Sequence, residues 1–289
     1  MWALAGTGTY YLEINCAMPS VDENKQWWND GYVWKQGGDE WSRAWGGVDM
    51  QWHAAVLPRI HSFVPAGRIL EIAPGFGRWT QYLTGLCDHL IAVDLSENAI
   101  EHCRQRFAGD TNIDFFVNDG SSLEMVPDAS IDFVFSFDSL VHASADVLRA
   151  YLLQIARKLT RDGVAFLHHS NLGEYTRYFS AVEKIPPRGQ PLLKKVGLEY
   201  RTHWRDPGMT AGRLREFAQE AGLICISQEL FGWGGSRRLI DAISMVTLPE
   251  SKWTRPLRLL RNEDFVRDIS VIARLAPLYS ADSFPASAE

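Results

Sequence analysis

Histidine and aspartate residues gather after two apolar segments of the sequence, IDFVFSF and GVAFLHHS. Asp138 and His142 are four residues apart, so on one helical turn the carboxylate could orient the imidazole. An imidazole held in this way is a suitable general base for taking the proton of a hydroxyl nucleophile. Alternatively, His142 caps the next helix or packs beside a bound cofactor. The residues alone support both interpretations equally.

His168 and His169 are consecutive residues of an expected strand and therefore point to opposite faces. Only one of them can enter a pocket at the strand end, and the other belongs to the core. If one of them converges with Asp138 and His142, a divalent metal becomes an alternative, with Asp138 and His169 as ligands and Mg²⁺ as the ion that suits hard oxygen ligation. The sequence has no cluster of carboxylates with clear ligand spacing, so the metal-free alternative is favoured.

A glycine-rich turn lies in the segment LEIAPGFGRWT. A strand is expected to end at Glu71, and Gly75 and Gly77 then let the backbone approach a ligand closely before a helix begins. Such a turn could bind a dinucleotide. However, Thr80 replaces the third glycine of GxGxxG, and Ala73 occupies a position that is commonly glycine, so the turn matches a pyrophosphate poorly.

Two acidic residues follow at the ends of the next two expected strands. Asp94 lies 23 residues beyond Glu71, which is the usual place for a carboxylate that accepts the ribose hydroxyls of an adenosine. Asp119 and Gly120 end the third strand, where an acid and adjacent backbone can bond an adenine edge. Together the three features predict a cofactor that contains adenosine.

The elements that must position these residues alternate between short apolar and helical patterns from Arg68 onward. The expected strands are RILEIA, HLIAVDL, IDFFVND, IDFVFSF and GVAFLHHS, followed by an antiparallel pair, ICISQELFGW and LIDAISMVTL. The expected helices are RWTQYLTGL, ENAIEHCRQRF, ADVLRAYLLQIARKL and TAGRLREFAQEAGL. This alternation predicts an α/β fold with a doubly wound, mostly parallel, seven-stranded sheet that is covered by helices on both faces.

The order of ExxPGxG, Asp94, NDG and IDFVFSFDS resembles the class I S-adenosylmethionine-dependent methyltransferases, over about residues 67–171. The resemblance implies that S-adenosyl-L-methionine is the cofactor and that the fold is Rossmann-like. The resemblance implies Glu71, Gly75 and Gly77 around the methionine part, Asp94 at the ribose, and Asp119 with Gly120 at the adenine. Ala73, Leu95 and Ser136 are also expected to bind the cofactor. Ala73 departs from the family pattern, and its methyl group is expected to narrow the turn without abolishing it.

The strings SFDSLVHA and LHHSNLGEY, with an aromatic N-terminal arm, look like methyltransferases of bacterial polysaccharide and glycolipid biosynthesis. This resemblance implies O-methylation of a sugar hydroxyl in an oligosaccharide or polysaccharide, with His142 as the base and Asp138 beside it. The residues expected to contact the glycan are Tyr32, Trp34, His169, Asn171 and Tyr175. The alternatives are a small aromatic, lipid or amine acceptor, and a regulatory protein that binds the cofactor without turnover.

The N-terminal part is unusually aromatic, with six tryptophans between Trp27 and Trp52. These side chains form either a clasp packed on the core or a lid over a pocket. We therefore expect an N-terminal extension and arm at 1–60, a methyltransferase domain at 61–250 with an inserted substrate loop at 171–209, and a helical tail at 251–289.

The overall composition excludes several other classes. A net charge of −6 without long basic runs argues against a nucleic-acid partner, and no apolar stretch is long enough to span a bilayer. Four widely spaced cysteines favour a reducing, cytoplasmic compartment. The sequence leaves open the sugar and hydroxyl, the oligomeric state and whether residues 1–17 are native.

Overall fold

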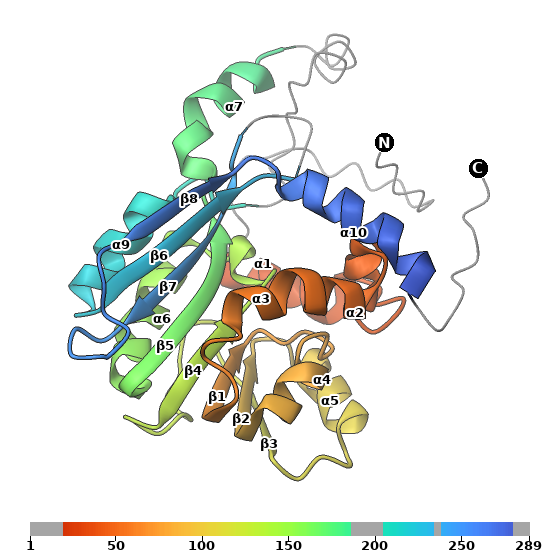
Figure 1. Cartoon of the computed structure of the whole chain (residues 1–289), viewed down its shortest axis with the longest axis vertical. Helices are drawn as coiled ribbons and strands as arrows, with labels where there is room; N and C mark the ends of the chain where they lie inside the picture. Colours follow the sequence, from red (N-terminus) through yellow and green to blue (C-terminus); the bar gives the residue numbers. More distant parts are fainter. Residues whose placement is uncertain (1–19, 186–204, 234–237, 280–289) are drawn as a thin grey trace.

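The computed structural model describes residues 20–185, 205–233 and 238–279. Residues 1–17 therefore lie outside the described residues, as does the middle of the inserted loop expected at 171–209. The described residues build one central sheet with helices on both faces (Figure 1).

The sheet has the strand order β3-β2-β1-β4-β5-β7-β6-β8. Its strands are β1 (Ala66–Ile72), β2 (Cys87–Asp94), β3 (Ile113–Val117), β4 (Ile131–Ser136), β5 (Leu159–Ser170), β6 (Ile224–Phe231), β7 (Asp241–Thr247) and β8 (Arg258–Asn262). Neighbouring strands are parallel except that β7 is antiparallel to both β5 and β6. The doubly wound, mostly parallel α/β fold is confirmed, as is the closing antiparallel pair.

The eighth strand was not expected, because the tail at 251–289 was interpreted as helical. β8 pairs in parallel with β6 at the edge of the sheet, and helix α10 (Phe265–Tyr279) follows it. Leu259 and Leu260 are both more than half exposed, so the strand has no buried face that would give it a period of two. Backbone pairing with β6, rather than side-chain pattern, defines this strand.

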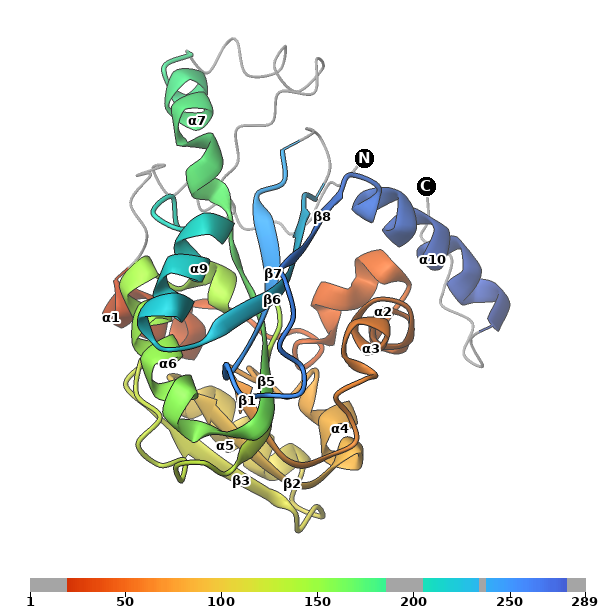
Figure 2. The same ribbon diagram turned by 60° about the vertical axis from the view of Figure 1, so that its left-hand side comes forward.

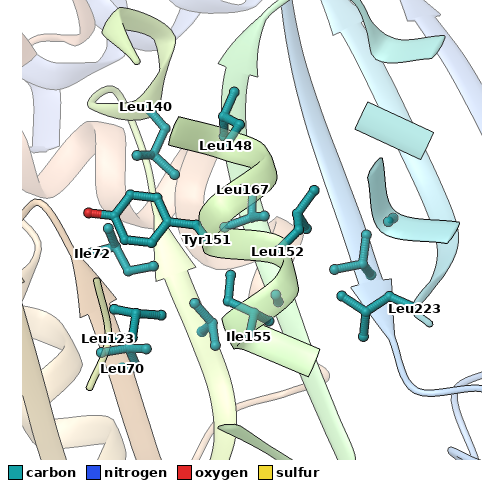
Figure 3. Close-up of a cluster of buried hydrophobic side chains, with 14 of the residues drawn as sticks. Leu70, Ile72, Leu123, Leu140, Leu148, Tyr151, Leu152, Ile155, Leu167 and Leu223 are labelled. Carbon is teal, nitrogen blue, oxygen red and sulfur yellow. The ribbon is translucent and has the colours of Figure 1, made fainter. Parts of the chain in front are cut away.

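Helices α5 (Glu97–Arg106), α6 (Ala145–Lys158) and α9 (Ala211–Glu220) each carry an apolar stripe. Figure 3 shows α6 packed on the sheet, with Leu148, Leu152 and Ile155 in the same buried cluster as Leu70 and Ile72 of β1. Figure 2 shows α6 and α9 together on one side of the sheet.

The opposite face of the sheet is covered by the short elements that precede β1, together with α4 (Thr80–Leu83) and α10. The preceding elements are η2 (Asp39–Trp45), α2 (Val48–Gln51), η3 (Trp52–Val56) and α3 (Leu57–Ile60). Trp45 and Trp52 are almost fully buried here, and Trp45 packs edge-on against Phe265 of α10. This second half of the aromatic arm is therefore a clasp on the core.

The first half of the arm consists of α1 (Val21–Gln26) and η1 (Trp27–Gly31), neither of which has a fully buried residue. Ser20 caps α1 through a reciprocal pair of hydrogen bonds with Glu23. None of the described helices has both the length and the apolar character needed to cross a bilayer.

Candidate cofactor and acceptor site

A ligand-binding crevice is expected where the strand order reverses, between β1 and β4, at the carboxyl ends of the parallel strands. The glycine turn leaves β1 at this point. Ala73, Gly75 and Gly77 all have positive φ angles, of 60°, 57° and 87°. A Cβ added to Gly77 would stand 2.5 Å from Phe107 Cε2, so this position needs glycine for space as well as for conformation.

Two serines from the β4 side hold the turn in place. Ser136 Oγ donates to the carbonyl of Ile72 and Ser139 Oγ donates to that of Ala73, both at 2.9 Å. Ser136 is fully buried, and its hydroxyl acts on the backbone of the turn. Sequence reasoning placed Ser136 near the cofactor and missed the partner role of Ser139.

Asp94 joins the end of β2 to the same turn. One carboxylate oxygen accepts from the Gly75 N–H at 3.0 Å, and the other accepts from the Ser96 N–H at 2.8 Å. Burial raises the pKa of Asp94 to about 6, although these backbone hydrogen bonds lower it. Leu95 is half-buried and lies beside Gly120, at the next strand end. The ribose and adenine positions implied by the sequence are thus adjacent.

The Asp119 side chain forms hydrogen bonds within its own loop. Its Oδ1 accepts from the N–H groups of Ser121 and Ser122, and the first of these bonds is the main cause of a lowered pKa. The Gly120 N–H donates to Asn118 Oδ1 at 2.9 Å. Asn118 was not among the residues selected from the sequence, yet its side chain holds the loop that contains the NDG motif.

Glu71 is buried at the end of β1, with 1% of its surface exposed. Its Oε2 accepts from Thr80 Oγ1 at 2.6 Å, whereas Oε1 has no partner among the described residues. Burial raises the pKa of Glu71 to about 8. The carboxyl group is therefore placed to receive a hydrogen-bond donor from a ligand.

Asp138 follows β4 in a left-handed conformation, with φ of 70°. Its carboxylate lies 3.0 Å from Arg78 Nη2, and its backbone N–H donates to His168 Nδ1 at 3.0 Å. Burial raises the pKa of Asp138, but Arg78 and His168 outweigh this effect and lower it overall. The carboxylate that was expected to orient His142 is paired with Arg78 instead.

His168 continues into a buried charged network. Its Nε2 lies 3.3 Å from Asp241 Oδ2, and Asp241 is bound by Arg205 through two hydrogen bonds of 2.7 and 2.8 Å. Trp233 Nε1 also donates to Asp241. The sequence did not reveal these partners, because Arg205 and Asp241 are 36 residues apart and no local pattern links them.

The other histidine of the pair lies in the core, so the alternation along β5 separates the two as expected. His169 has both ring nitrogens within 2.8 Å of oxygens, those of the Ser170 carbonyl and the Ser244 hydroxyl. Burial lowers the pKa of His169 to about 4, so the ring is neutral. This placement gives no support to a glycan contact by His169.

Metal binding by Asp138 and His169 also finds no support, because the two residues have separate partners. No group of three or more His, Cys, Asp or Glu side chains within the described ranges is arranged to hold a metal ion.

The side chains of Asn171 and Tyr175 both bond to backbone groups of the segment before β7. The Asn171 side chain donates to the Leu239 carbonyl and accepts from the Ala211 N–H, and Tyr175 Oη accepts from the Leu239 N–H. Asn171 is 1% exposed. Both residues tie the end of β5 to the segment that leads into β7.

His142 ends the short helix η5 (Leu140–His142) and is half-buried. Its ring centroid lies 5.8 Å from that of Trp28 in the arm, and its carbonyl accepts from Asn24 Nδ2 at 3.2 Å. The structure thus places an imidazole and an indole side by side, next to the β4 end of the crevice.

The N-terminal arm contacts, in turn, the Gly120 loop, the segment after β2 and the glycine turn. A Cβ on Gly120 would stand 2.9 Å from Val21, and Ser96 Oγ donates to Asn29 Oδ1 at 2.6 Å. Trp34 stacks on Phe76 of the glycine turn with 4.3 Å between ring centroids. Tyr32 packs edge-on against Trp34, and its hydroxyl donates to Glu40.

Comparison with known proteins agrees with this geometry. Residues 69–163 match the model of the methyltransferase domain family. The PH0226 protein from Pyrococcus horikoshii OT3 has a similar structure, with a TM-score of 0.51, 17% identity, and coverage of 77% of this chain and 95% of that one. Magnesium protoporphyrin IX methyltransferase from Synechocystis PCC 6803, solved with bound SAH, gives a TM-score of 0.50, 17% identity, and coverage of 79% and 99%.

Similarity to curated relatives is confined to short segments. Ribosomal RNA small subunit methyltransferase A of Geobacter sulfurreducens is 38% identical over 74 residues, which are 25% of this chain and 27% of that protein. Demethylmenaquinone methyltransferase of Clavibacter sepedonicus is 34% identical over 83 residues, 29% of this chain and 34% of that protein. The matches span about a third or less of these relatives. The fold and the match over residues 69–163 are those of a methyltransferase domain.

Proposed function

We propose that this protein transfers the methyl group of S-adenosylmethionine to a hydroxyl oxygen of a sugar in an oligosaccharide or polysaccharide. The methyl donor is inferred from one observation, that Glu71, the glycine turn and Asp94 lie together at the β1–β4 crevice. The residues present fit the cofactor, because Glu71 keeps a buried oxygen without a partner among the described residues and the turn has the positive φ angles of a tight glycine turn.

Each part of the cofactor has residues that would hold it. Gly75 and Gly77 would lie along the methionine part, Asp94 would accept the ribose hydroxyls, and Leu95 with the Gly120 loop would contact the adenine. When bound, S-adenosylmethionine supplies a methyl carbon whose bond to sulfur breaks as the acceptor oxygen forms its new bond. The chain mainly has to hold that oxygen about 3 Å from the methyl carbon on the correct axis.

A sugar hydroxyl needs a base because its oxygen is a poor nucleophile while it keeps its proton. His142 is proposed to take that proton. Its position beside Trp28 supports this role, since an indole face suits the apolar face of a sugar ring. Tyr32 and Trp34 extend the same aromatic surface. Asp138, which pairs with Arg78, is proposed to act on the site through that arginine.

We also propose that residues 20–36 form a lid over the bound cofactor. The lid contacts the turn, the ribose strand end and the adenine loop, and these contacts support closure. Gly37 and Gly38 follow it with φ angles of 62° and 92°, which makes them a suitable hinge. From Trp45 onward the chain belongs to the core and would not move with the lid.

The function is tested with radiolabelled S-adenosylmethionine and a panel of oligosaccharides, each supplied with free and with fully O-methylated hydroxyls. Label transfer to the free form alone, unchanged by Mg²⁺ or by a chelator, is the expected result. Transfer to amine, quinone or aromatic acceptors with none to any glycan would overturn the sugar assignment. Absence of S-adenosylhomocysteine binding by calorimetry would overturn the methyl donor itself.

A further inference from the structure

Helix α10 carries apolar side chains on its solvent face as well as on its buried face. The buried residues are Phe265, Ile269 and Ala276. Val271, Leu275 and Leu278 follow one another at spacings of four and three residues on the other side of the helix, and they are 39%, 40% and 72% exposed. A helix that only covered a core would have polar side chains on this second face.

Strand β8 adds a second pair of exposed leucines. Leu259 and Leu260 lie between Arg258 and Arg261, and all four side chains are exposed. β8 is the edge strand of the sheet, and two residues separate it from α10. Figure 2 shows α10 at the periphery, with α2 and α3 on its inner side. We call the exposed residues from Arg258 to Leu278 the β8–α10 surface.

The charge of this part of the chain is opposite to that of the whole. Residues 251–279 contain six basic and three acidic side chains, a net charge of +3, whereas the full chain has −6. Arg258, Arg261 and Arg274 are exposed, and none of them has a carboxylate partner among the described residues. The surface therefore combines free positive charge with exposed apolar side chains.

This combination distinguishes between the kinds of partner that could cover the surface. A second copy paired edge to edge along β8 would bring Arg258 and Arg261 of both chains together, and like charges on facing strands are destabilising. A nucleic acid would satisfy the arginines but would leave the leucines in water. An anionic lipid surface suits both, because headgroup phosphates attract the arginines and the acyl boundary takes up the leucines.

We propose that the β8–α10 surface docks on membranes that contain anionic phospholipid. Leu275 and Leu278 enter the boundary between headgroups and acyl chains, while Arg258 and Arg261 contact phosphates. With 15 residues, α10 is shorter than the roughly 20 needed to cross a bilayer, so it lies in the plane of the interface. The inference does not depend on the proposed function.

Flotation of the full chain with lipid vesicles tests the proposal. One set of vesicles is phosphatidylcholine alone, and the other contains about one third phosphatidylglycerol. We expect at least ~10-fold tighter binding to the anionic vesicles, weakening as the salt concentration is raised from about 0.1 M to about 0.5 M, because salt screens the attraction. Equal binding to both kinds of vesicle, or binding to neither, would overturn the proposal.

The charged half of the surface is tested by Arg258→Gln combined with Arg261→Gln. This double variant should bind anionic vesicles ~10- to 30-fold more weakly, in keeping with the attraction of two arginines to an anionic leaflet. Arg104→Gln combined with Arg215→Gln, which changes exposed arginines of α5 and α9, is the matched control and should bind as wild type does.

The apolar half is tested by Leu278→Ser, which should weaken vesicle binding ~3- to 10-fold. Leu153→Ser, at an exposed leucine of α6, is its control. If Leu278→Ser shifts the urea midpoint, Leu275→Ser takes its place. Wild-type vesicle affinity in both the arginine and the leucine variants would overturn the proposal. A dimer in sedimentation that Leu278→Ser dissociates would instead assign the surface to a second copy of the chain.

Discussion

Ser96 Oγ donates a hydrogen bond to Asn29 Oδ1 over 2.6 Å, which ties the N-terminal arm to the strand end that carries Asp94. Asn98 strengthens the link, since its side chain donates to the Asn29 carbonyl and its N–H to the Asn29 side chain. The arm is thus joined to the carboxyl end of β2 by polar contacts, which can break and reform without exposing the core.

The first prediction concerns this link. Asn29→Ala removes the acceptor for Ser96, so a lid that closes over the cofactor should open more often. We expect S-adenosylhomocysteine to dissociate roughly 3- to 10-fold faster in stopped-flow measurements, in keeping with the loss of one hydrogen bond. Gln105→Ala changes an exposed side chain elsewhere on α5 and serves as the control. Unchanged dissociation in Asn29→Ala would contradict the lid.

The second prediction concerns Glu71 and pH. Burial raises its pKa from an ordinary 4.5 to about 8, so the folded, ligand-free protein holds a proton that the unfolded chain has lost. The free energy of unfolding should therefore fall as the pH rises from about 4.5 to 8. Thermal unfolding at pH 5 and pH 8 should show a larger drop in Tm for wild type than for Glu71→Gln. Asp94, whose pKa is raised to about 6, is present in both proteins and cancels in the comparison.

The third prediction concerns the backbone of the turn. Gly77→Ala places a methyl group 2.5 Å from Phe107 at a φ of 87°, which is both a clash and a strained conformation. We expect a loss of about 2–4 kcal/mol in the free energy of unfolding by urea, from overpacking and backbone strain together. Gly85→Ala, which has open space around the added carbon, should cost far less. Equal costs for the two variants would show that the turn does not constrain Gly77.

The fold and the glycine turn after β1 could be predicted because their signals are local. Apolar runs give the strands, Gly75 and Gly77 mark the turn, and Asp94 follows its strand at a fixed distance. His168 and His169 are both fully buried, but they have different partners, Asp241 and Ser244, because a strand sends consecutive side chains to opposite faces.

The acceptor side could not be predicted in the same way, because its partners are distant in sequence. Asp138 is closer in sequence to His142, yet it pairs with Arg78 from the turn that follows β1. Asp241 reaches His168 only because β7 lies antiparallel to β5. β8 was not predicted for a related reason. Its exposed leucines do not alternate with polar residues, and its pairing with β6 is non-local.

The fourth prediction concerns the buried ion pair of Arg205 and Asp241. Asp241 is fully buried, and Arg205 with His168 outweighs the effect of burial, so the pKa of this carboxyl is held well below its usual range. Asp241→Asn leaves Arg205 without its carboxylate and should cost about 3–5 kcal/mol in urea unfolding. Glu220→Gln breaks the exposed Arg149–Glu220 pair and should change the midpoint little. A small effect in Asp241→Asn would mean that water or another group satisfies Arg205.

The fifth prediction concerns His142, whose role as a base separates chemistry from cofactor binding. His142→Ala should lower kcat with the glycan acceptor by ~10²- to 10⁴-fold, the usual contribution of a general base, while S-adenosylhomocysteine binds as tightly as in wild type. His142→Gln keeps a polar side chain of similar reach but cannot take a proton, so it should be equally slow. His61→Ala, an exposed histidine near the end of α3, is the control. Near-normal turnover in His142→Gln would show that the imidazole only packs against Trp28, and the acceptor oxygen would then need another base or no base at all.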